Sequence, residues 1–332
     1  MFDLPGSWVW DFWFADDGEQ YHLFFLYASR ALHDPDARHY RASIGHAVSD
    51  DLVEWTQVAD ALVRSDAPAF DDLATWTGSI VRHPDGTWFL FYTGSTLAPD
   101  GKNVQRVGYA TSTDLHTWTK SEAPVLEAAA PWYETLDSGA WHDEAFRDPW
   151  VFADPDGDGW HMLITARAAR GPVDGRGVIG HAWSPDLRRW ELREPLSAPS
   201  ERGFGQLEVA QVEIVDGRPV LLFSCLAEHA TPTRRAARGG TWAVPADGLL
   251  GPYDIEGAYP LTDESLYVGR LIRRRSDGRW MLCAFRNVGP DGRFSGGITD
   301  PMPVRWAGDR LTVSLPDAAG VGADRSIGVA AG

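Results

Sequence analysis

Three acidic residues, Asp11, Asp148 and Glu208, each open a segment rich in aromatic and β-branched residues. Such segments are typical of half-buried or buried β-strands, where an unpaired carboxylate is unfavourable. Hydrolysis of a glycosidic bond needs one carboxylic acid to protonate the leaving oxygen and a second carboxylate to attack the anomeric carbon or to activate water. Any one of these residues is explained equally well by a turn cap or an arginine partner, but three at equivalent positions of a repeat favour chemistry on a sugar.

The element that carries these carboxylates occurs five times. Each copy predicts a β-hairpin made of an apolar strand, a tight turn on Asp-Gly and a second strand rich in aromatic residues. Glycine suits this turn because it adopts a positive φ without steric cost. The five turns are Asp17-Gly18, Asp85-Gly86, Asp158-Gly159, Asp216-Gly217 and Asp277-Gly278.

A second motif follows the hairpin and is regular in the first three copies. It is a Gly-X-Ala triplet followed by a serine, an Asp-Leu pair and a tryptophan, and it predicts a third strand with a turn. Its copies start at Gly45, Gly108 and Gly180 and end at Trp55, Trp118 and Trp190. Because these tryptophans recur with the repeat, we interpret them as structural.

The repeat predicts an all-β, single-domain, five-bladed β-propeller over residues 1–332. A four-stranded unit cannot bury both faces alone, and radial stacking of such sheets buries them against one another. The expected blades lie at roughly 8–60, 74–122, 145–195, 205–257 and 265–315. A jelly roll or sandwich is the alternative, although neither explains a fivefold repeat. In a propeller the innermost strands line a central channel, so Asp11, Thr77, Asp148 and Glu208 are expected to converge at one mouth.

The composition indicates which partners are excluded. The 332 residues carry 47 acidic and 30 basic side chains, which give a formal net charge of −17. This charge repels nucleic acids and anionic membranes, so we expect neither as a partner. A neutral small-molecule carbohydrate fits better, and the sequence leaves the oligomeric state open.

Two further features concern the cellular compartment. No apolar segment approaches transmembrane length, and the first residues lack the basic and apolar regions of a signal peptide. Cys225 and Cys283 fall in predicted second strands, and two cysteines do not make the disulfide framework of a secreted protein. We therefore expect buried free thiols and a cytoplasmic protein.

Several residues near the strand starts are candidates for the wall of the pocket. By the alternation of side chains along a strand, Trp13 shares a face with Asp11, and Trp150 shares a face with Asp148. Trp13 and Trp76 are the aromatic residues that we expect to stack on a sugar ring, with core packing as the alternative. The other expected wall residues are Thr77, Arg147, Trp150, Gln206 and Tyr267.

No cofactor or metal ion is expected. The 10 histidines do not form a ligand-spaced cluster. The segment from Asp154 to Asp158 begins like a calcium loop, but the glutamate expected at its twelfth position is absent, and we interpret it as an acidic hairpin. Glu213 lies five residues after Glu208, which in a strand places it on the opposite face, so it is the weaker candidate for an acid or base.

Taken together, five segments resemble glycoside hydrolase family 32, the invertases and fructanases, and its sister family 68, the levansucrases. The resemblance covers about the first 225 residues. It rests on Tyr21–Phe25, on Gly45–Ser49 with Asp51-Leu52 and Trp55, on Thr75–Ser79, on Phe91–Gly94 and on Phe146–Pro149.

The resemblance implies a role for each of the three carboxylates. Asp11 matches the nucleophile that attacks the anomeric carbon of a fructosyl unit. Asp148, within Arg147-Asp148-Pro149, matches the residue that binds sugar hydroxyls and stabilises the transition state, and Glu208 matches the general acid/base. The implied activity is retaining hydrolysis of β-fructofuranosides, or transfer of fructosyl units, through a covalent fructosyl-enzyme.

The chain departs from the family pattern beside both reacting carboxylates. Trp10 and Phe12-Trp13 flank Asp11 where the family usually has Asn-Asp-Pro-Asn-Gly, and no cysteine follows Glu208. These changes leave the identity of the substrate open. Two alternatives stay open as well: an inverting hydrolase like the arabinanases and xylosidases, and a propeller that binds glycans without cleaving them.

Overall fold

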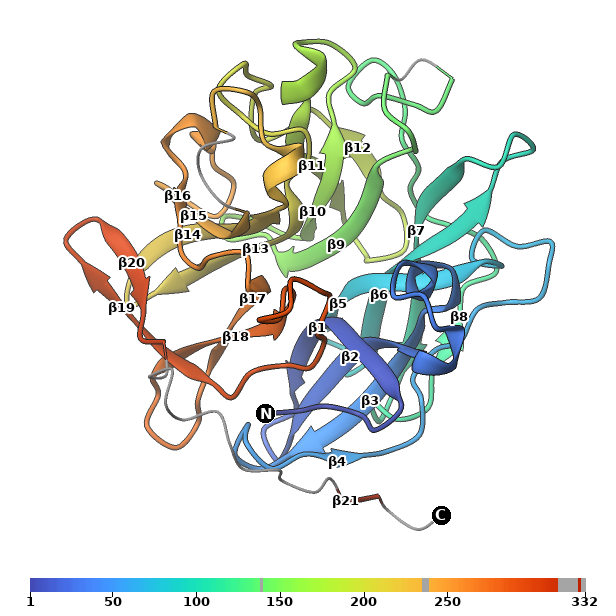
Figure 1. The fold of residues 1–332 in the computed structure, drawn as a ribbon, viewed down its shortest axis with the longest axis vertical. Coiled ribbons are helices and arrows are strands. Elements are labelled where there is room, and N and C mark those ends of the chain that lie inside the picture. The colour runs from blue at the N-terminus through green and yellow to red at the C-terminus, as the bar shows by residue number, and fades with distance from the viewer. Residues whose placement is uncertain (138–139, 235–238, 316–327, 330–332) are drawn as a thin grey trace.

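The computed structural model describes residues 1–137, 140–234, 239–315 and 328–329, and the rest of the predicted 1–332 span lies outside the described residues. Five antiparallel sheets surround a common centre, as Figure 1 shows, so the prediction of a five-bladed β-propeller is confirmed. In each sheet the strand that comes first in the sequence lies at one edge, and the chain then runs to the other edge.

The bounds of the elements follow the repeat. The first sheet contains β1 (Ser7–Asp16), β2 (Tyr21–Ser29), β3 (Ser43–Ser49) and β4 (Thr56–Gln57), to which β21 (Gly328–Val329) adds in parallel. The second contains β5 (Ala74–Arg82), β6 (Trp88–Leu97), β7 (Asn103–Ser112) and β8 (Thr119–Lys120). The third contains β9 (Phe146–Ala153), β10 (Trp160–Arg167), β11 (Gly177–Ser184) and β12 (Glu191–Arg193).

The last two sheets have the same layout. The fourth contains β13 (Glu208–Val215), β14 (Arg218–Cys225), β15 (Gly240–Pro245) and β16 (Tyr259–Pro260). The fifth contains β17 (Leu266–Arg273), β18 (Trp280–Arg286), β19 (Met302–Ala307) and β20 (Arg310–Val313). The short 3-10 helices are η1 (Arg30–Leu32), η2 (Asp36–Arg41), η3 (Val173–Gly175), η4 (Ala227–His229) and η5 (Ile255–Gly257). Among the described residues no helix is long and apolar enough to cross a membrane.

The predicted hairpin turns are confirmed by their backbone angles. The glycine of each Asp-Gly pair has a positive φ, between 71° at Gly278 and 107° at Gly159. A side chain at these positions would strain the backbone, which is why the repeat retains glycine there.

The tryptophans of the second motif are structural, as predicted. Trp118 donates its indole N–H to the carbonyl of Leu115, and its ring meets Phe24 of the first sheet edge-to-face at 5.9 Å between centroids. Trp190 packs in the same way on Phe91 of the second sheet, at 5.4 Å. These contacts bury aromatic surface between neighbouring blades, and full burial of one such side chain is worth about 1.5–3 kcal/mol.

The innermost strand of every blade is interrupted by a β-bulge. The pairing shifts between Val9 and Phe12 in β1, between Trp76 and Gly78 in β5, and opposite Leu163 and Thr165 in β9. It shifts again after Glu208 in β13 and after Tyr267 in β17. Bulges bend a strand and redirect its side chains, and they are frequent beside active sites.

In three blades the bulge contains a non-glycine residue with a positive φ: Asp148 at 58°, Val209 at 54° and Val268 at 52°. Such backbone strain costs about 1–3 kcal/mol per residue and persists where neighbours hold it. The neighbour here is a hydroxyl on the second strand of the preceding blade, which accepts the hydrogen bond of the strained N–H at 2.9–3.1 Å. The hydroxyls belong to Thr93, Thr165 and Ser224, respectively.

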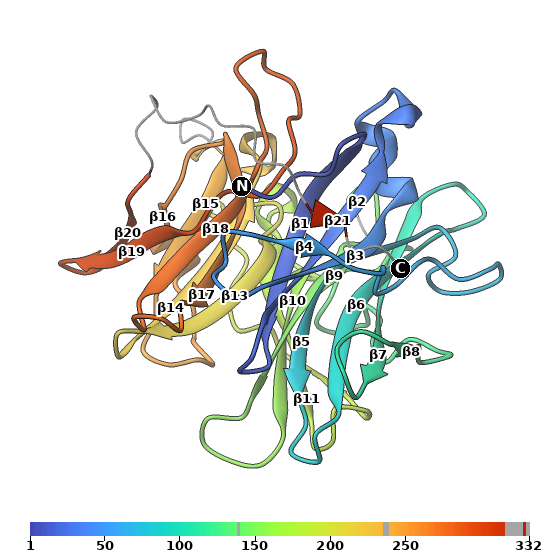
Figure 2. The same cartoon turned by 90° about the horizontal axis from the view of Figure 1, so that it is seen from below.

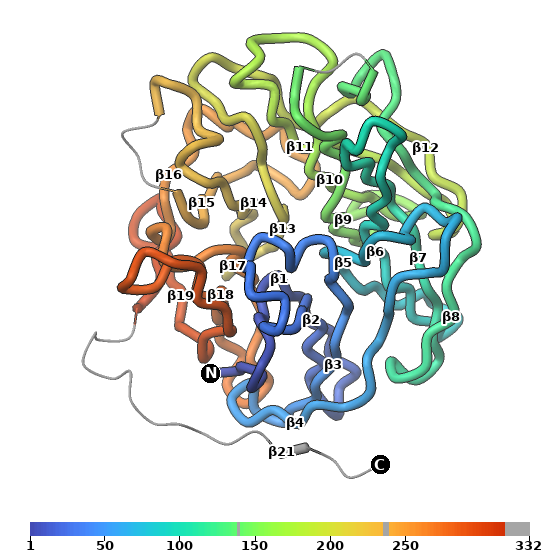
Figure 3. Tube along the Cα trace, turned by 45° about the vertical axis from the view of Figure 1, so that its right-hand side comes forward, coloured from blue at the N-terminus to red at the C-terminus, as the bar shows by residue number. Residues whose placement is uncertain are grey.

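The beginning of the chain lies against the last blade. Phe2 and Ile298 exchange backbone hydrogen bonds of 2.9 and 2.8 Å. The side view in Figure 2 and the trace in Figure 3 place this N-terminal segment beside β18. Backbone hydrogen bonds therefore connect the start of the chain, which leads into the first sheet, with the last blade.

Candidate active site

The three carboxylates selected from the sequence line one cavity of ≈ 520 Å³. Asp11 comes from β1, Asp148 from β9 and Glu208 from β13, so three different blades supply them. Thr77, Trp76, Arg147, Gln206 and Tyr267 line the same cavity, as expected. Its volume lies within the range of about 300–1,000 Å³ that is typical of small-molecule sites.

Asp11 lies in the bulge of β1. Its Oδ2 accepts a hydrogen bond from the hydroxyl of Thr77 in the next blade. Removal from water raises the pKa of Asp11 to about 7; the charges of Asp148 and Glu208 add to this rise, and the Thr77 bond and Arg270 oppose it. Asp11 therefore loses its proton near neutral pH, and two other carboxylates lie in the same cavity.

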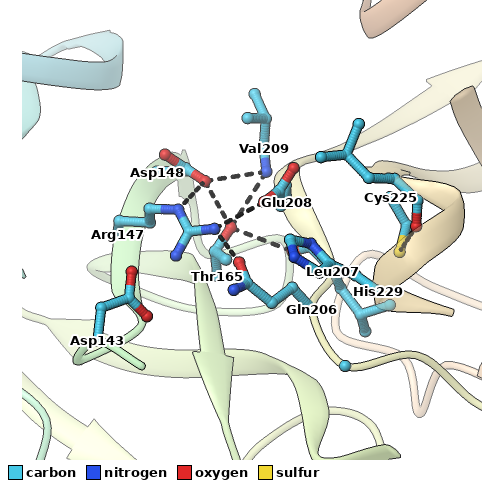
Figure 4. A network of polar contacts seen from close by, with 12 residues as sticks. Asp143, Arg147, Asp148, Thr165, Gln206, Leu207, Glu208, Val209, Cys225 and His229 are labelled. Carbon is cyan, nitrogen blue, oxygen red and sulfur yellow. Dashed lines mark hydrogen bonds and ion pairs between the residues drawn. The ribbon is translucent and has the colours of Figure 1, made fainter. Parts of the chain in front are cut away.

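Asp148 is only 2% exposed and is held by its neighbours on all sides. Its Oδ2 accepts hydrogen bonds from the Thr165 hydroxyl at 2.8 Å and from the backbone N–H of Val209 at 3.2 Å. Burial raises the pKa of Asp148, while the adjacent Arg147 acts in the opposite direction. Figure 4 shows Arg147, Thr165 and Val209 grouped around this side chain.

Glu208 is fixed by a cation on one oxygen and a phenol on the other. Arg147 donates from Nη2 to its Oε1 at 2.8 Å, and the hydroxyl of Tyr267 donates to its Oε2. Nη2 of Arg147 also donates to the side-chain oxygen of Gln206. Although burial acts to lower it, the pKa of Arg147 is raised by the charges of Asp148 and Glu208, so the guanidinium stays charged.

The expectation that the carboxylates occupy equivalent repeat positions is wrong. Arg147 and Glu208 directly precede the strained residue of their bulges, whereas Asp148 is itself the strained residue. Asp11 is the second of two residues that stand opposite Leu26 alone. Each carboxylate therefore occupies a different position relative to the bulge of its strand, and the three bulges direct the side chains into one cavity.

The predicted roles of Trp13 and Trp150 as cavity walls are also wrong. Trp13 is fully buried and stacks on Phe24 at 6.3 Å, and Trp150 lines a different cavity. Simple alternation of side chains does not hold here because both carboxylates lie in bulges, where two residues stand opposite one residue of the neighbouring strand. Trp10, on the other side of Asp11, lines the substrate-sized cavity instead.

A part of the wall that was missed comes from η2, between β2 and β3. This helix contributes Arg38, His39 and Tyr40 to the cavity. Burial lowers the pKa of His39 to about 3, so its imidazole is neutral, and its carbonyl accepts the indole N–H of Trp76 at 2.7 Å. The segment lies outside the repeat, so no pattern in the sequence could have indicated it.

Glu213 is separate from the site, in agreement with its lower rank. It lines a smaller cavity of ≈ 210 Å³ together with Trp150, Arg270 and the last residues of β1. Among the residues that the structure describes, no three His, Cys, Asp or Glu side chains are grouped as ligands for a metal ion.

Similar proteins carry out chemistry on fructose-containing sugars. A β-fructofuranosidase, insoluble isoenzyme 3, of Oryza sativa subsp. indica is 29% identical over 175 residues, which are 51% of this chain and 26% of the relative. An invertase of Kluyveromyces lactis is 27% identical over 208 residues, 58% of this chain and 29% of the relative. The chain thus spans less than a third of the length of these two relatives.

Solved structures support the same fold. An inulosucrase from Halalkalicoccus jeotgali bound to kestose superposes with a TM-score of 0.77 at 23% identity, over 93% of this chain and 87% of that chain. A levansucrase from Gluconacetobacter diazotrophicus superposes with a TM-score of 0.73 at 17% identity, over 94% and 81% of the two chains.

The sequence profile of the glycosyl hydrolases family 32 N-terminal domain matches residues 13–242. This span is more than half of the chain and contains Asp148 and Glu208, while Asp11 lies two residues before it and Tyr267 lies 25 residues after it. The chain belongs to glycosyl hydrolase family 32.

Proposed function

We propose that the protein is a retaining enzyme acting on β-fructofuranosides, such as sucrose or fructo-oligosaccharides. The observation that carries the proposal is the convergence of Asp11, Asp148 and Glu208 from three blades on one cavity. Two chemically different carboxyl environments are what a retaining glycosidase needs, because one group attacks and the other exchanges a proton. The named activity of the rice relative and the kestose bound to the inulosucrase support a fructosyl substrate.

In the first step the ionised Asp11 attacks the anomeric carbon of the fructosyl unit. The glycosidic C–O bond breaks, and the carboxylic acid of Glu208 gives its proton to the leaving oxygen. The product is an ester between Asp11 and the anomeric carbon, with Glu208 left as a carboxylate. Charge and atoms balance, because the negative charge of Asp11 has moved to Glu208.

In the second step an acceptor hydroxyl, from water or another sugar, attacks the same carbon. Glu208 takes the proton of that hydroxyl, the ester bond breaks, and Asp11 is released as a carboxylate. Two displacements at one carbon retain its configuration. Water as acceptor gives hydrolysis, and a sugar as acceptor gives transfer.

Asp148 and Arg147 have supporting roles in this proposal. Asp148 presents a carboxylate oxygen to the hydroxyls of the fructosyl unit, where hydrogen bonds that tighten as positive charge develops lower the barrier. Arg147 orients Glu208 and Asp148 together because one guanidinium contacts both.

The test is fructose release from sucrose and from inulin- and levan-type oligosaccharides. Asp11→Ala and Glu208→Gln are each expected to abolish release, whereas Glu213→Gln, at a half-buried carboxyl outside the cavity, is the matched control and retains it. NMR of the first-formed sugar is expected to show the β-anomer. Unchanged activity in either catalytic variant contradicts the assignment, and an inverted first product supports the inverting alternative.

A further inference from the structure

A buried arginine lies behind the three carboxylates and takes no part in the cavity that holds the substrate. Arg270 of β17 is 1% exposed and lines the smaller cavity of ≈ 210 Å³. That cavity is formed by residues farther along the inner strands than Asp11 and Glu208 are, such as Phe14 in β1 and Gln211 in β13. Arg270 therefore approaches the site from the interior of the channel.

The contacts of Arg270 reach each of the three strands that carry a carboxylate. Its Nε donates to the carbonyl of Phe12, the residue after Asp11, at 3.3 Å. Its Nη1 donates to the carbonyl of Ala210, two residues after Glu208, at 3.0 Å. Its guanidinium carbon lies 5.0 Å from the ring centroid of Trp150, two residues after Asp148.

A second contact fixes β17 itself against the strand of Glu208. The side chain of Gln211 in β13 accepts the backbone N–H of Leu271 at 2.8 Å and donates to the carbonyl of Leu271 at 2.9 Å. Because Leu271 follows Arg270, this pair of hydrogen bonds fixes the position of Arg270 along the channel relative to β13.

The contacts of Arg270 do not neutralise its positive charge. Its two hydrogen-bond partners are neutral carbonyl oxygens, and Nη2 has no hydrogen-bond partner within the described part of the chain. A buried cation without a direct counter-ion is costly, and its Coulombic attraction to Asp148, Asp11 and Glu213 offsets that cost. Burial lowers the pKa of Arg270 to about 10, so it is still protonated at neutral pH.

We propose that Arg270 is the positioning residue of this site, holding the bulges of β1, β9 and β13 so that Asp11, Asp148 and Glu208 reach one substrate, and supplying a positive charge that favours the ionised form of Asp11. The inference rests on the proposed function, in which Asp11 is the nucleophile. Arg270 does not touch substrate, because it does not line the cavity.

The ionisation of Asp11 depends on every charged group that faces it. Asp148 and Glu208 oppose ionisation, and Arg270 and the hydrogen bond from Thr77 favour it. Arg38 of η2 also carries a positive charge toward Asp11. Loss of Arg270 removes a cation that favours ionised Asp11, so the pKa of Asp11 rises. The acid limb of the pH profile of kcat/KM, where Asp11 becomes protonated, then moves to higher pH.

The variants Arg270→Met and Arg270→Lys separate charge from geometry. Methionine fills similar space without charge, so the acid limb of kcat/KM is expected to rise by about 1 pH unit. Lysine keeps the charge but cannot donate to both carbonyls in the same fork, so the limb stays in place while kcat falls about tenfold or more with KM little changed.

Arg167→Met is the matched control. Arg167 is also 1% exposed, pairs with Glu134 and lies over Trp141, and it does not contact β1 or β13. We expect a lower melting temperature and an unmoved acid limb for this variant, which distinguishes a role in positioning from the general cost of deleting a buried arginine.

The titration of the Asp11 carboxyl, followed by carbon-13 NMR with Asp11→Asn for assignment, gives a reading that needs no substrate. A higher midpoint in Arg270→Met than in the wild type supports the inference. An unmoved midpoint in a folded Arg270→Met protein overturns it. If Arg270→Met does not fold, Arg270→Lys decides, and a wild-type kcat in that variant overturns the positioning role. Absence of fructoside turnover in the wild type contradicts the proposed function, while the carboxyl titration still tests Arg270.

Discussion

Arg147 joins Glu208 and Asp148 through one guanidinium group: its Nη2 donates to Oε1 of Glu208 at 2.8 Å, and its Nε lies 3.4 Å from Oδ2 of Asp148. The two carboxylates come from different blades, so their relative position depends on this side chain. A planar guanidinium can hold two carboxylates at once, whereas an ammonium group cannot reproduce the fork.

Arg147→Lys is therefore expected to lower kcat/KM on a fructoside by about 100-fold, because small displacements of reacting groups have effects of this size. Arg176→Lys is the control, since Arg176 pairs with Glu134 outside the cavity. Steady-state kinetics measure both. A loss of less than about threefold in Arg147→Lys contradicts the positioning of the two carboxylates by Arg147.

Tyr267→Phe removes the hydroxyl that donates to Glu208 and leaves the ring in place against Phe285, 5.7 Å away. Burial, followed by the charge of Glu208, raises the pKa of Tyr267 well above its ordinary value, so the phenol remains a donor at any working pH. A hydrogen bond to a charged group is worth about 1.5–3 kcal/mol, so kcat is expected to fall about 10- to 100-fold.

The matched control for this experiment is Tyr253→Phe, in a buried tyrosine whose hydroxyl donates to the carbonyl of Leu249 outside the cavity. We expect wild-type kinetics from it. Equal kinetics in Tyr267→Phe and the wild type would show that Glu208 does not need this donor.

The half-buried carboxyl of Asp11 also has a consequence for stability. Its pKa rises from 3.8 to about 7 on folding, so between these pH values the folded chain binds a proton that the unfolded chain has released. The free energy of unfolding therefore falls as the pH rises from about 4 to about 7. Asp11→Asn carries no such charge, and its melting temperature is expected to exceed that of the wild type at about pH 8 by more than at about pH 4.

Glu213→Gln serves as the comparison, because burial also raises the pKa of Glu213 to about 7. Thermal melts are expected to show the same direction of change in both variants, while only Asp11→Asn loses turnover. A melting temperature of Asp11→Asn that is lower than the wild type at about pH 8 contradicts the cost assigned to the ionised carboxylate.

Arg38 is expected to bind substrate. It is 8% exposed, lines the cavity and lies 3.8 Å from the ring centroid of Phe294, and its Nε has no hydrogen-bond partner within the described residues. Arg38→Gln is expected to raise KM about tenfold with a smaller change in kcat, because a donor to the sugar is lost in ground and transition states alike.

Arg38→Lys keeps the positive charge and tests whether the planar group is needed. Initial rates over a range of sucrose concentrations measure both variants. A KM of Arg38→Gln within about twofold of the wild type shows that Arg38 does not contact the substrate.

The sequence predicts the blades because the turn chemistry is local. Asp-Gly pairs such as Asp216-Gly217 set the hairpins through the positive φ of glycine, and the Asp-Leu-Trp turns recur with each of the first three blades. The three carboxylates could also be identified from local sequence, because an acidic residue at the start of an apolar strand is unfavourable unless it has a partner or a function. The cytoplasmic location and the catalytic roles stay predictions.

The bulges could not be predicted, because their cause lies in another blade. The positive φ of Asp148 is held by the hydroxyl of Thr93, which is 55 positions away in the sequence. In β1, strand alternation that ignores the bulge places Trp13 on the face of Asp11, whereas in the structure Trp10 lines the cavity. The sequence suggests Arg270 only as a weaker candidate for the rim of the site, because its partners Phe12 and Ala210 become neighbours only when the ring closes.

In the proposed mechanism Asp11 becomes covalently attached to a fructosyl unit. The most direct measurement uses Glu208→Gln with a fructosyl donor whose leaving group needs no protonation, such as a fructosyl fluoride, followed by acid quench and peptide mass spectrometry. The first step then proceeds while the second is slow, because no base activates the acceptor. We expect one anhydrofructose unit on the peptide that contains Asp11. Attachment to a different carboxylate, or turnover to an inverted product without any attachment, would contradict it.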